Sequence, residues 1–276
     1  MDYGHIMNPP MPRLVPLLWL IVLLAAVTPT HAGAETVRAA AVVDGDTLRL
    51  EDGRVLRLSG IDAPRPPAGA DPARRWPLAE GAAALLGDLT AGQPLSLAVE
   101  VAEDRYGRVL AQVTREDGLW IQGEMLRRGL ARVQTRADAH ARTPEMLTVE
   151  AEARAARRGL WRTRAYAVRD AADTARLSRD RDSFQVVEGT VVSAAKVKNL
   201  IYLNFGSDWR EDTTVSIDSA AAKACARAGL DPLALQGRMV RVRGWVTERN
   251  GPMIAVTHPE QIERIDAPSD IIPETE

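Results

Sequence analysis

The sequence predicts a mainly β fold with additional helices, an α+β architecture of two small barrels. Short runs rich in valine, leucine and isoleucine are separated by Asp-Gly and Asn-Gly pairs, which are typical of hairpin turns. Helical patterns fall between only a few of these runs, which favours barrels over a parallel sheet. An arginine-rich stretch at 163–183 separates two such β-rich blocks, and a chain of 276 residues is long enough for both.

The first block begins with a predicted three-stranded meander. Its strands are Thr36–Val43, Asp46–Leu50 and Arg54–Gly60, with turns at Asp44-Gly45 and Asp52-Gly53. A loop rich in Pro, Gly and Arg follows at 64–77. The meander supplies three of the five strands that we expect in the first barrel.

The rest of the first block alternates helices with the remaining strands. A helix at Leu78–Leu89 is introduced by Pro77, which suits the first turn of a helix. The further elements are strands at Leu95–Val101 and Val109–Thr114 and helices at Ile121–Arg128 and Thr143–Arg158. Trp161 closes the unit, so we place the first domain at residues 35–162.

The second block follows a charged, partly helical linker that we place at residues 163–183. Three β-runs, a helix around Ala220–Ala228 and two further β-runs joined by Asn250-Gly251 fill residues 184–266. Strand-strand-strand-helix-strand-strand is the order of an OB-fold barrel. The polar tail at 267–276 is predicted to be disordered.

The N-terminal 34 residues have the pattern of a signal peptide. Arg13 precedes an apolar run at 14–27, and small residues lead to Ala34. The run falls short of the ~20 residues that span a bilayer, so an uncleaved anchor is the less favoured alternative. We therefore expect a protein exported to the periplasm or the medium, with no membrane attachment after cleavage; the start codon and the oligomeric state stay open.

Composition excludes several functional classes. The net charge of −2 gives no general attraction to nucleic acid, so any such binding needs a local basic surface. Cys225 stands alone, which excludes an internal disulfide. After cleavage only His140 and His258 remain, which argues against a histidine-rich zinc site or a histidine-centred triad.

Two aspartates near one end of the predicted meander could share a hard cation. Asp46 follows the first turn, and Asp62 comes at the end of the third strand. Calcium binds carboxylate and carbonyl oxygens, and the carbonyl of Ala63 is a natural third ligand. Arg57 precedes Asp62 by five residues, so strand parity puts the two on opposite sides unless a bulge or turn intervenes.

Four stretches of the first block resemble the thermonuclease (staphylococcal nuclease-like) family in order and spacing. They are VVDGDTLRL at 42–50, RLSGIDAP at 57–64, DRYGRVLAQV at 104–113 and LRRGLARV at 126–133. Four ordered motifs are a specific signal, whereas any one would be weak. The resemblance covers about residues 35–162 and implies a five-stranded OB barrel with three helices, which binds Ca²⁺ and cleaves phosphodiester bonds in DNA or RNA.

The resemblance also implies roles for individual residues. Asp46, Asp62 and the Ala63 carbonyl become calcium ligands. The catalytic residues become Arg57 and Arg108, whose guanidinium groups match two phosphate oxygens and stabilise developing negative charge. The substrate-binding residues become Arg105 and Tyr106, on the turn before the fifth strand.

The chain departs from the family pattern at three positions. The glutamate that serves the family as general base is Arg65 here, and arginine accepts no proton at physiological pH. Losing a positioned base typically costs ~10²–10⁴-fold in rate. Two tyrosines that contact the nucleotide in the family correspond to Thr135 and Ala137. Three nearby carboxylates could replace the base, and the sequence does not choose among them: Asp44, Asp71 and Glu80.

Three functions therefore stay open. The first is a calcium-dependent nuclease that works at the family's rate or more slowly. The second is a degenerate tandem OB protein that binds nucleic acid or another anion, and the third is an envelope protein-interaction module. Both aspartates and both arginines are retained, which favours the first two. The role of the second domain is undecided, since Tyr202, Phe205 and Trp245 suit either a core or a strand-binding surface.

Overall fold

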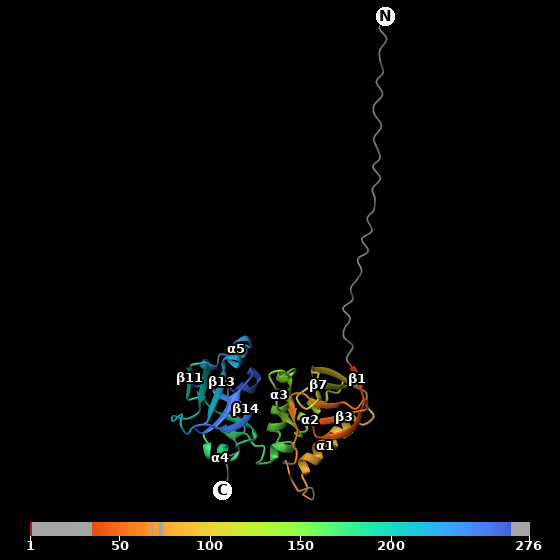
Figure 1. The fold of residues 1–276 in the computed structure, drawn as a ribbon, viewed down its shortest axis with the longest axis horizontal. Coiled ribbons are helices and arrows are strands. Elements are labelled where there is room, and N and C mark those ends of the chain that lie inside the picture. The colour runs from red at the N-terminus through yellow and green to blue at the C-terminus, as the bar shows by residue number, and fades with distance from the viewer. Residues whose placement is uncertain (2–34, 68, 72–73, 266–276) are drawn as a thin grey trace. The chain divides into compact units, whose positions relative to one another are not determined.

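The computed structural model describes Met1 and residues 35–67, 69–71 and 74–265 (Figure 1). The predicted signal peptide, apart from Met1, and the predicted tail at 267–276 lie outside the described residues. Residues from Glu35 onward belong to one structural unit. In the described part of the chain, no helix combines the length and the apolar character needed to span a membrane.

The first sheet curls into the predicted barrel. Its strand order is β1-β6-β7-β4-β3-β2. The strands at the two ends of this order, β1 and β2, are parts of one segment interrupted at Arg38, so the sheet closes on itself. The bounds are β1 (Glu35–Val37), β2 (Ala39–Asp44), β3 (Thr47–Leu50), β4 (Val55–Leu58), β6 (Leu95–Val101) and β7 (Arg108–Arg115).

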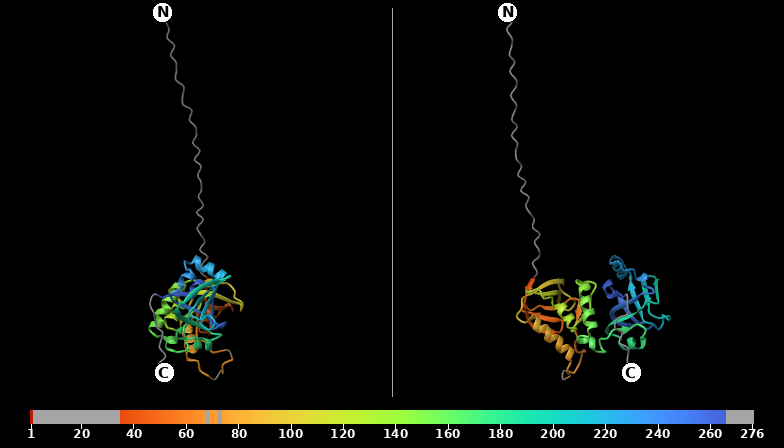
Figure 2. Two further views of the ribbon diagram at one scale, coloured as in Figure 1. Left: turned by 90° about the vertical axis from the view of Figure 1, so that its left-hand side faces the viewer. Right: turned by 180° about the vertical axis from the view of Figure 1, so that it is seen from behind.

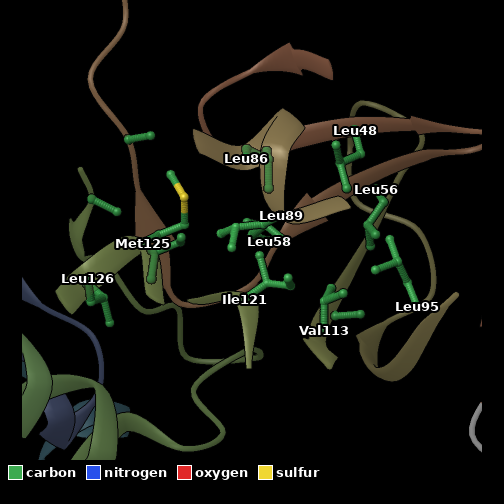
Figure 3. Close-up of a cluster of buried hydrophobic side chains, with 14 of the residues drawn as sticks. Leu48, Leu56, Leu58, Leu86, Leu89, Leu95, Val113, Ile121, Met125 and Leu126 are labelled. Atoms are coloured by element: carbon green, nitrogen blue, oxygen red, sulfur yellow. The ribbon is translucent and has the colours of Figure 1, made fainter. Parts of the chain in front are cut away.

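Three helices pack against this barrel and contribute to its core. They are α1 (Pro77–Thr90), α2 (Ile121–Arg127) and α3 (Thr143–Ala155). Leucine alternation on the strands places Leu48, Leu56 and Leu58 inside, where Leu86 of α1 and Met125 of α2 complete a tightly buried core (Figure 3). Aromatic residues are scarce in this core.

Two short strands that the sequence pattern did not predict carry one of the aspartates. β5 (Ile61–Asp62) pairs antiparallel with β8 (Arg132–Val133), which sets Asp62 opposite Arg132. Gly60 makes the turn into β5 with a φ of +80°, and a Cβ there would lie 2.5 Å from Met146 Cε. Glycine suits this left-handed backbone, which other residues rarely adopt.

The second sheet repeats the strand order of the first. Figure 2 shows the ribbon of both β-rich blocks from two further sides. Its path is β11-β12-β13-β15-β14-β10-β9, and β10 and β11 are again parts of one segment. In both barrels the third strand pairs parallel with the fifth: β4 with β7, and β13 with β15. The strands are β10 (Phe184–Thr190), β11 (Ser193–Val197), β12 (Leu200–Asn204), β13 (Thr214–Asp218), β14 (Met239–Glu248), β15 (Pro252–Val256) and β16 (Ile262–Arg264), with α5 (Ser219–Arg227) after β13.

The segment at 163–183 differs from the linker that the sequence pattern predicted. It forms β9 (Arg169–Asp170), which pairs with β10, and α4 (Thr174–Arg179). Ala171 and Leu177 are buried in the second core. The apolar residues of this segment are spaced among many arginines and form no sustained apolar stripe in the sequence. Their burial depends on packing against β10 and β14, which a local pattern does not show.

A buried ion pair connects α3 of the first barrel with β14 of the second. Arg243 is 0% exposed and donates to Glu150 Oε2 at 3.0 Å and to the Val133 carbonyl at 3.1 Å. Glu150 Oε1 accepts from the Val133 N–H at 2.7 Å. Burial alone would raise the pKa of Glu150, but Arg243 outweighs it and lowers the pKa. The pair therefore fixes β8 from both sides.

Replacing Arg243 should strongly destabilise the protein. Arg243→Met leaves the Glu150 carboxylate buried without its main cation, which typically costs ~3–5 kcal/mol. Urea unfolding at pH 7 measures this loss, with the exposed Arg249→Met as the matched control. A loss below ~1 kcal/mol would show that the pair does not hold the barrels together.

Candidate active site

The turn between β2 and β3 places Asp46 inside the barrel end. Asp44 pairs with Thr47, so Gly45 and Asp46 form the turn itself, one residue later than the predicted Asp44-Gly45. The Asp46 N–H donates to Asp44 Oδ1 at 3.0 Å. A Cβ on Gly45 would lie 2.7 Å from Ala63 Cβ, so glycine lets the turn pack against the loop after β5.

Asp46 is a fully buried carboxylate surrounded by donors. Its Oδ1 accepts from Arg57 and its Oδ2 accepts from Arg65 at 2.9 Å. The Ala63 N–H donates to Oδ2 at 2.7 Å, and the ligand role of the Ala63 carbonyl stays a prediction. Burial raises the pKa of Asp46 to about 6, against the opposing effects of Arg57 and Arg65.

Asp62 lies at the same barrel end, and Arg65 joins it to Asp46. Asp62 Oδ1 accepts from Arg65 Nη2 at 3.0 Å, the same nitrogen that donates to Asp46. Asp62 Oδ2 accepts from Arg132 at 3.1 and 3.2 Å. The structure thus brings the two predicted aspartates together, with a guanidinium between them.

Arg57 reaches this cluster despite the objection from strand parity. It leaves β4 and donates to the Ile61 carbonyl at 3.2 Å, and its Nη2 lies 3.7 Å from Asp62 Oδ1. The turn at Gly60 separates β4 from β5, so alternation does not continue from Arg57 to Asp62. The turn is the intervening irregularity that the sequence argument required.

Arg108 is on the neighbouring strand and faces the same way as Arg57. β4 and β7 are parallel, with Val55 opposite Arg108 and Arg57 opposite Leu110. Arg57 and Arg108 therefore share a face and are displaced by ~7 Å along the strands. Asp104 holds Arg108 through bonds of 2.8 and 3.0 Å to its side chain.

Tyr106 presents an exposed ring beside two cations. Its side chain is on the surface, with the guanidinium carbons of Arg105 and Arg108 at 4.7 and 5.0 Å from the ring centroid. Asp104 accepts from the Tyr106 N–H at 2.9 Å and so orders the turn. An aromatic ring flanked by guanidinium groups can stack a nucleic-acid base next to a bound phosphate.

Arg132 is a site residue that the sequence reasoning missed. It donates to Asp62 and, at 2.8 Å, to the Phe184 carbonyl of the second barrel. Its guanidinium also lies 5.2 Å from the Tyr166 ring centroid and 4.8 Å from that of Phe184. Its place in LRRGLARV was the available signal, but nothing in the spacing pairs residue 132 with residue 62.

A calcium ion does not fit the oxygens as this structure arranges them. Calcium needs six to eight oxygen ligands. Among the described residues, no group of three or more His, Cys, Asp or Glu side chains could hold a metal ion. The oxygens of Asp46 and Asp62 accept from Arg57, Arg65 and Arg132. Calcium as the cofactor stays a prediction from the resemblance.

A hollow next to Arg65 is lined by the three carboxylates that are candidates to replace the base. This hollow of about 460 Å³ includes Asp44, Asp71 and Glu80 in its wall. Glu80 accepts from Arg75 at 3.1 Å and from the Trp76 N–H at 3.0 Å, and Arg75 lowers its pKa. Burial opposes the effect at Asp44, yet hydrogen bonds from Asp46 lower its pKa as well. Carboxylates with lowered pKa values are weak bases.

The second barrel covers one of the positions where the family has a nucleotide-contacting tyrosine. Thr135 is buried, and its hydroxyl is 2.7 Å from His258 Nε2. Burial lowers the pKa of His258 to about 4, so the ring is neutral at pH 7. Ala137 is exposed. Nucleotide contacts at position 135 are therefore replaced by contacts between the barrels.

Asp104 should contribute stability that depends on pH in a defined window. Its burial raises the pKa, but hydrogen bonds from Arg108 and the Tyr106 N–H outweigh this and lower the pKa to about 2. Since the pKa is depressed, the contribution is complete above the ordinary value near ~4 and is lost as the pH falls toward 2.

Asp104→Asn tests this arrangement. The stability difference between wild type and variant, measured by urea unfolding, should be constant from pH 5 to 8 and shrink below pH 4. A difference that grew on acidification would contradict the ion pair with Arg108. Asp88→Asn, exposed on α1, is the control.

Comparison with known proteins identifies the first barrel. A family model described as staphylococcal nuclease homologue matches residues 55–163. An uncharacterized endonuclease of Escherichia coli is 33% identical over 127 residues, which cover 45% of this chain and 75% of that protein. A probable staphylococcal-like nuclease of Oryza sativa subsp. japonica is 34% identical over 106 residues, 38% of this chain and 28% of that protein.

These matches agree with the motifs and with the barrel. The matched segment contains Arg57, Asp62, Arg65, Arg108 and Arg132. The match with the bacterial relative is long enough to cover most of that protein. The chain belongs to the family of staphylococcal nuclease homologues.

Proposed function

We propose that this protein is a nuclease that hydrolyses phosphodiester bonds of single-stranded DNA or RNA at the Asp46 end of the first barrel. The observation that carries the proposal is the clustering of the family's aspartates and arginines there, on elements far apart in sequence. The relatives' names, an endonuclease and a probable staphylococcal-like nuclease, add support.

Arg57 and Arg108 are the proposed phosphate-binding residues. Both are on one face of adjacent strands, and Arg108 is pre-positioned by Asp104. Hydrolysis builds negative charge on the non-bridging oxygens of the phosphate, and fixed guanidinium groups stabilise that charge. Tyr106 offers a stacking surface for a base beside this phosphate.

The proposed reaction is slow because Arg65 replaces the glutamate that serves the family as general base. Arg65 occupies the position of the family's glutamate and cannot take a proton from water. Asp44 and Glu80 have lowered pKa values, so neither is well matched to deprotonating water at pH 7. The resemblance implies calcium as the cofactor, but guanidinium groups already bind the oxygens of Asp46 and Asp62, so no step of the proposed reaction is assigned to a metal ion.

Lysine substitutions test the phosphate-binding residues. Arg57→Lys and Arg108→Lys keep the charge but lose the planar fork, so each should lower kcat/KM on single-stranded DNA by ~10²-fold or more. Arg249→Lys, exposed on the second barrel, is the matched control and should leave the rate unchanged. Equal rates in all four proteins would place the chemistry elsewhere.

A second function is favoured by Arg65 itself. Without a carboxylate at this position the barrel could bind nucleic acid and not cleave it. Binding of labelled single-stranded DNA without any product, in calcium and in EDTA, would select this alternative.

We also propose that the protein is exported after removal of residues 1–34. The support is the sequence pattern of a basic residue, an apolar run and small residues before Glu35. Mass spectrometry of protein recovered from the exporting host should give an N-terminus within a few residues of Glu35. Recovery of the intact chain in the membrane fraction would contradict export by cleavage.

A further inference from the structure

The side chain of Arg65 bridges two carboxylates that come from different elements. One nitrogen, Nη2, lies 2.9 Å from Asp46 Oδ2 and 3.0 Å from Asp62 Oδ1. Asp46 belongs to the β2–β3 turn and Asp62 to β5, so the guanidinium ties these elements together. Two carboxylates near each other need a cation between them if both are to stay ionised.

The surrounding charges balance only with Arg65 included. Asp46 has no exposed surface, so an unpaired charge there is expensive. The carboxylates in the cluster are equal in number to its guanidinium groups. They are Asp44, Asp46 and Asp62 on one side and Arg57, Arg65 and Arg132 on the other. A divalent cation would gain no net attraction from this neutral cluster. The Arg65 guanidinium already occupies the place between the two aspartates where the cation would bind.

The backbone around Arg65 also favours this arrangement. Pro64 precedes it, and Pro66 and Pro67 follow it. Proline fixes its own φ and restricts the residue before it to extended conformations, so less conformational entropy is lost when Arg65 is ordered. The side chain is nevertheless 44% exposed and lines the hollow described above. It is held between the aspartates while part of it faces solvent.

We propose that the Arg65 guanidinium is a built-in cation of this site, which takes the place of the divalent metal that the family resemblance implies. The wild-type chain then binds no calcium at Asp46 and Asp62 and folds without it. This inference rests on the site of the proposed function and deepens it, since any cleavage by the wild type is then equally fast in calcium and in EDTA.

Removing the guanidinium should open the aspartates to calcium. Arg65→Gln leaves one negative charge in excess and Arg65→Glu leaves two, so calcium affinity should rise from wild type through Arg65→Gln to Arg65→Glu. Both variants should melt below the wild type in EDTA. Calcium at a hundredfold excess over the dissociation constant should raise their Tm by roughly 5–10 °C.

The experiment combines thermal melts with calorimetric titration of calcium into the full chain. Arg65→Lys keeps the charge, so calcium should neither raise its Tm nor give binding heat. Arg74→Gln removes a charge from the wall of the same hollow, where Arg74 stacks on Trp76. This variant should also show no calcium-dependent change in Tm and no binding heat. Asp46→Asn added to Arg65→Gln should abolish the gained calcium response.

Each result decides the inference. Calcium binding by the wild type as tight as by Arg65→Gln would overturn it, as would a failure of both Arg65→Gln and Arg65→Glu to bind calcium. If Arg65→Gln does not fold, the wild-type titration and Arg65→Glu purified in calcium still give the answer. None of these readouts needs cleavage, so a protein that binds nucleic acid without cutting it would refute the proposed function alone.

Discussion

The burial of one carboxylate organises this end of the molecule. Asp46 has no exposed surface, and an isolated ionised carboxylate in that position would cost several kcal/mol. The cost is offset by donors that come from separate elements: Arg57 from β4, the Ala63 N–H and Arg65 from the loop after β5. Each donor must be placed accurately for Asp46 to be buried at all. The turn, the strand and the loop therefore depend on one another.

The hydrogen bonds and ion pairs that neutralise the buried carboxylates also extend to the second barrel. Asp62 is paired with Arg132, whose guanidinium also donates to the Phe184 carbonyl of the second barrel. Val133, the next residue, is bonded to Glu150 and Arg243. The second barrel thus supports the short strand β8 that faces Asp62, and its His258 contacts Thr135. A role for the second barrel in holding the site follows from these contacts, whether or not it also touches substrate.

The motif residues could be assigned from sequence because their order and spacing are local properties. Asp46 and Asp62 were expected at one end of a meander, and the structure brings them together there. Strand parity alone left the direction of Arg57 open, and the turn at Gly60 lets it reach both aspartates. The contacts of the Arg65 side chain could not be assigned from the sequence in the same way. From the sequence it was only a missing base, since a long flexible side chain can point in several directions. Its direction depends on where the buried negative charge lies in the folded barrel.

The sequence by itself determined the β-rich barrels, the family and the residue types at the site, because alternation, turn dipeptides and ordered motifs are written along the chain. The tertiary structure alone decided which side chains meet. Asp62 and Arg132 are seventy residues apart in the sequence, and they pair because β5 lies next to β8. Burial of Ala171 and Leu177 in the second core likewise depends on β10 and β14. Such contacts arise from packing and charge neutralisation across elements, and no local pattern encodes them.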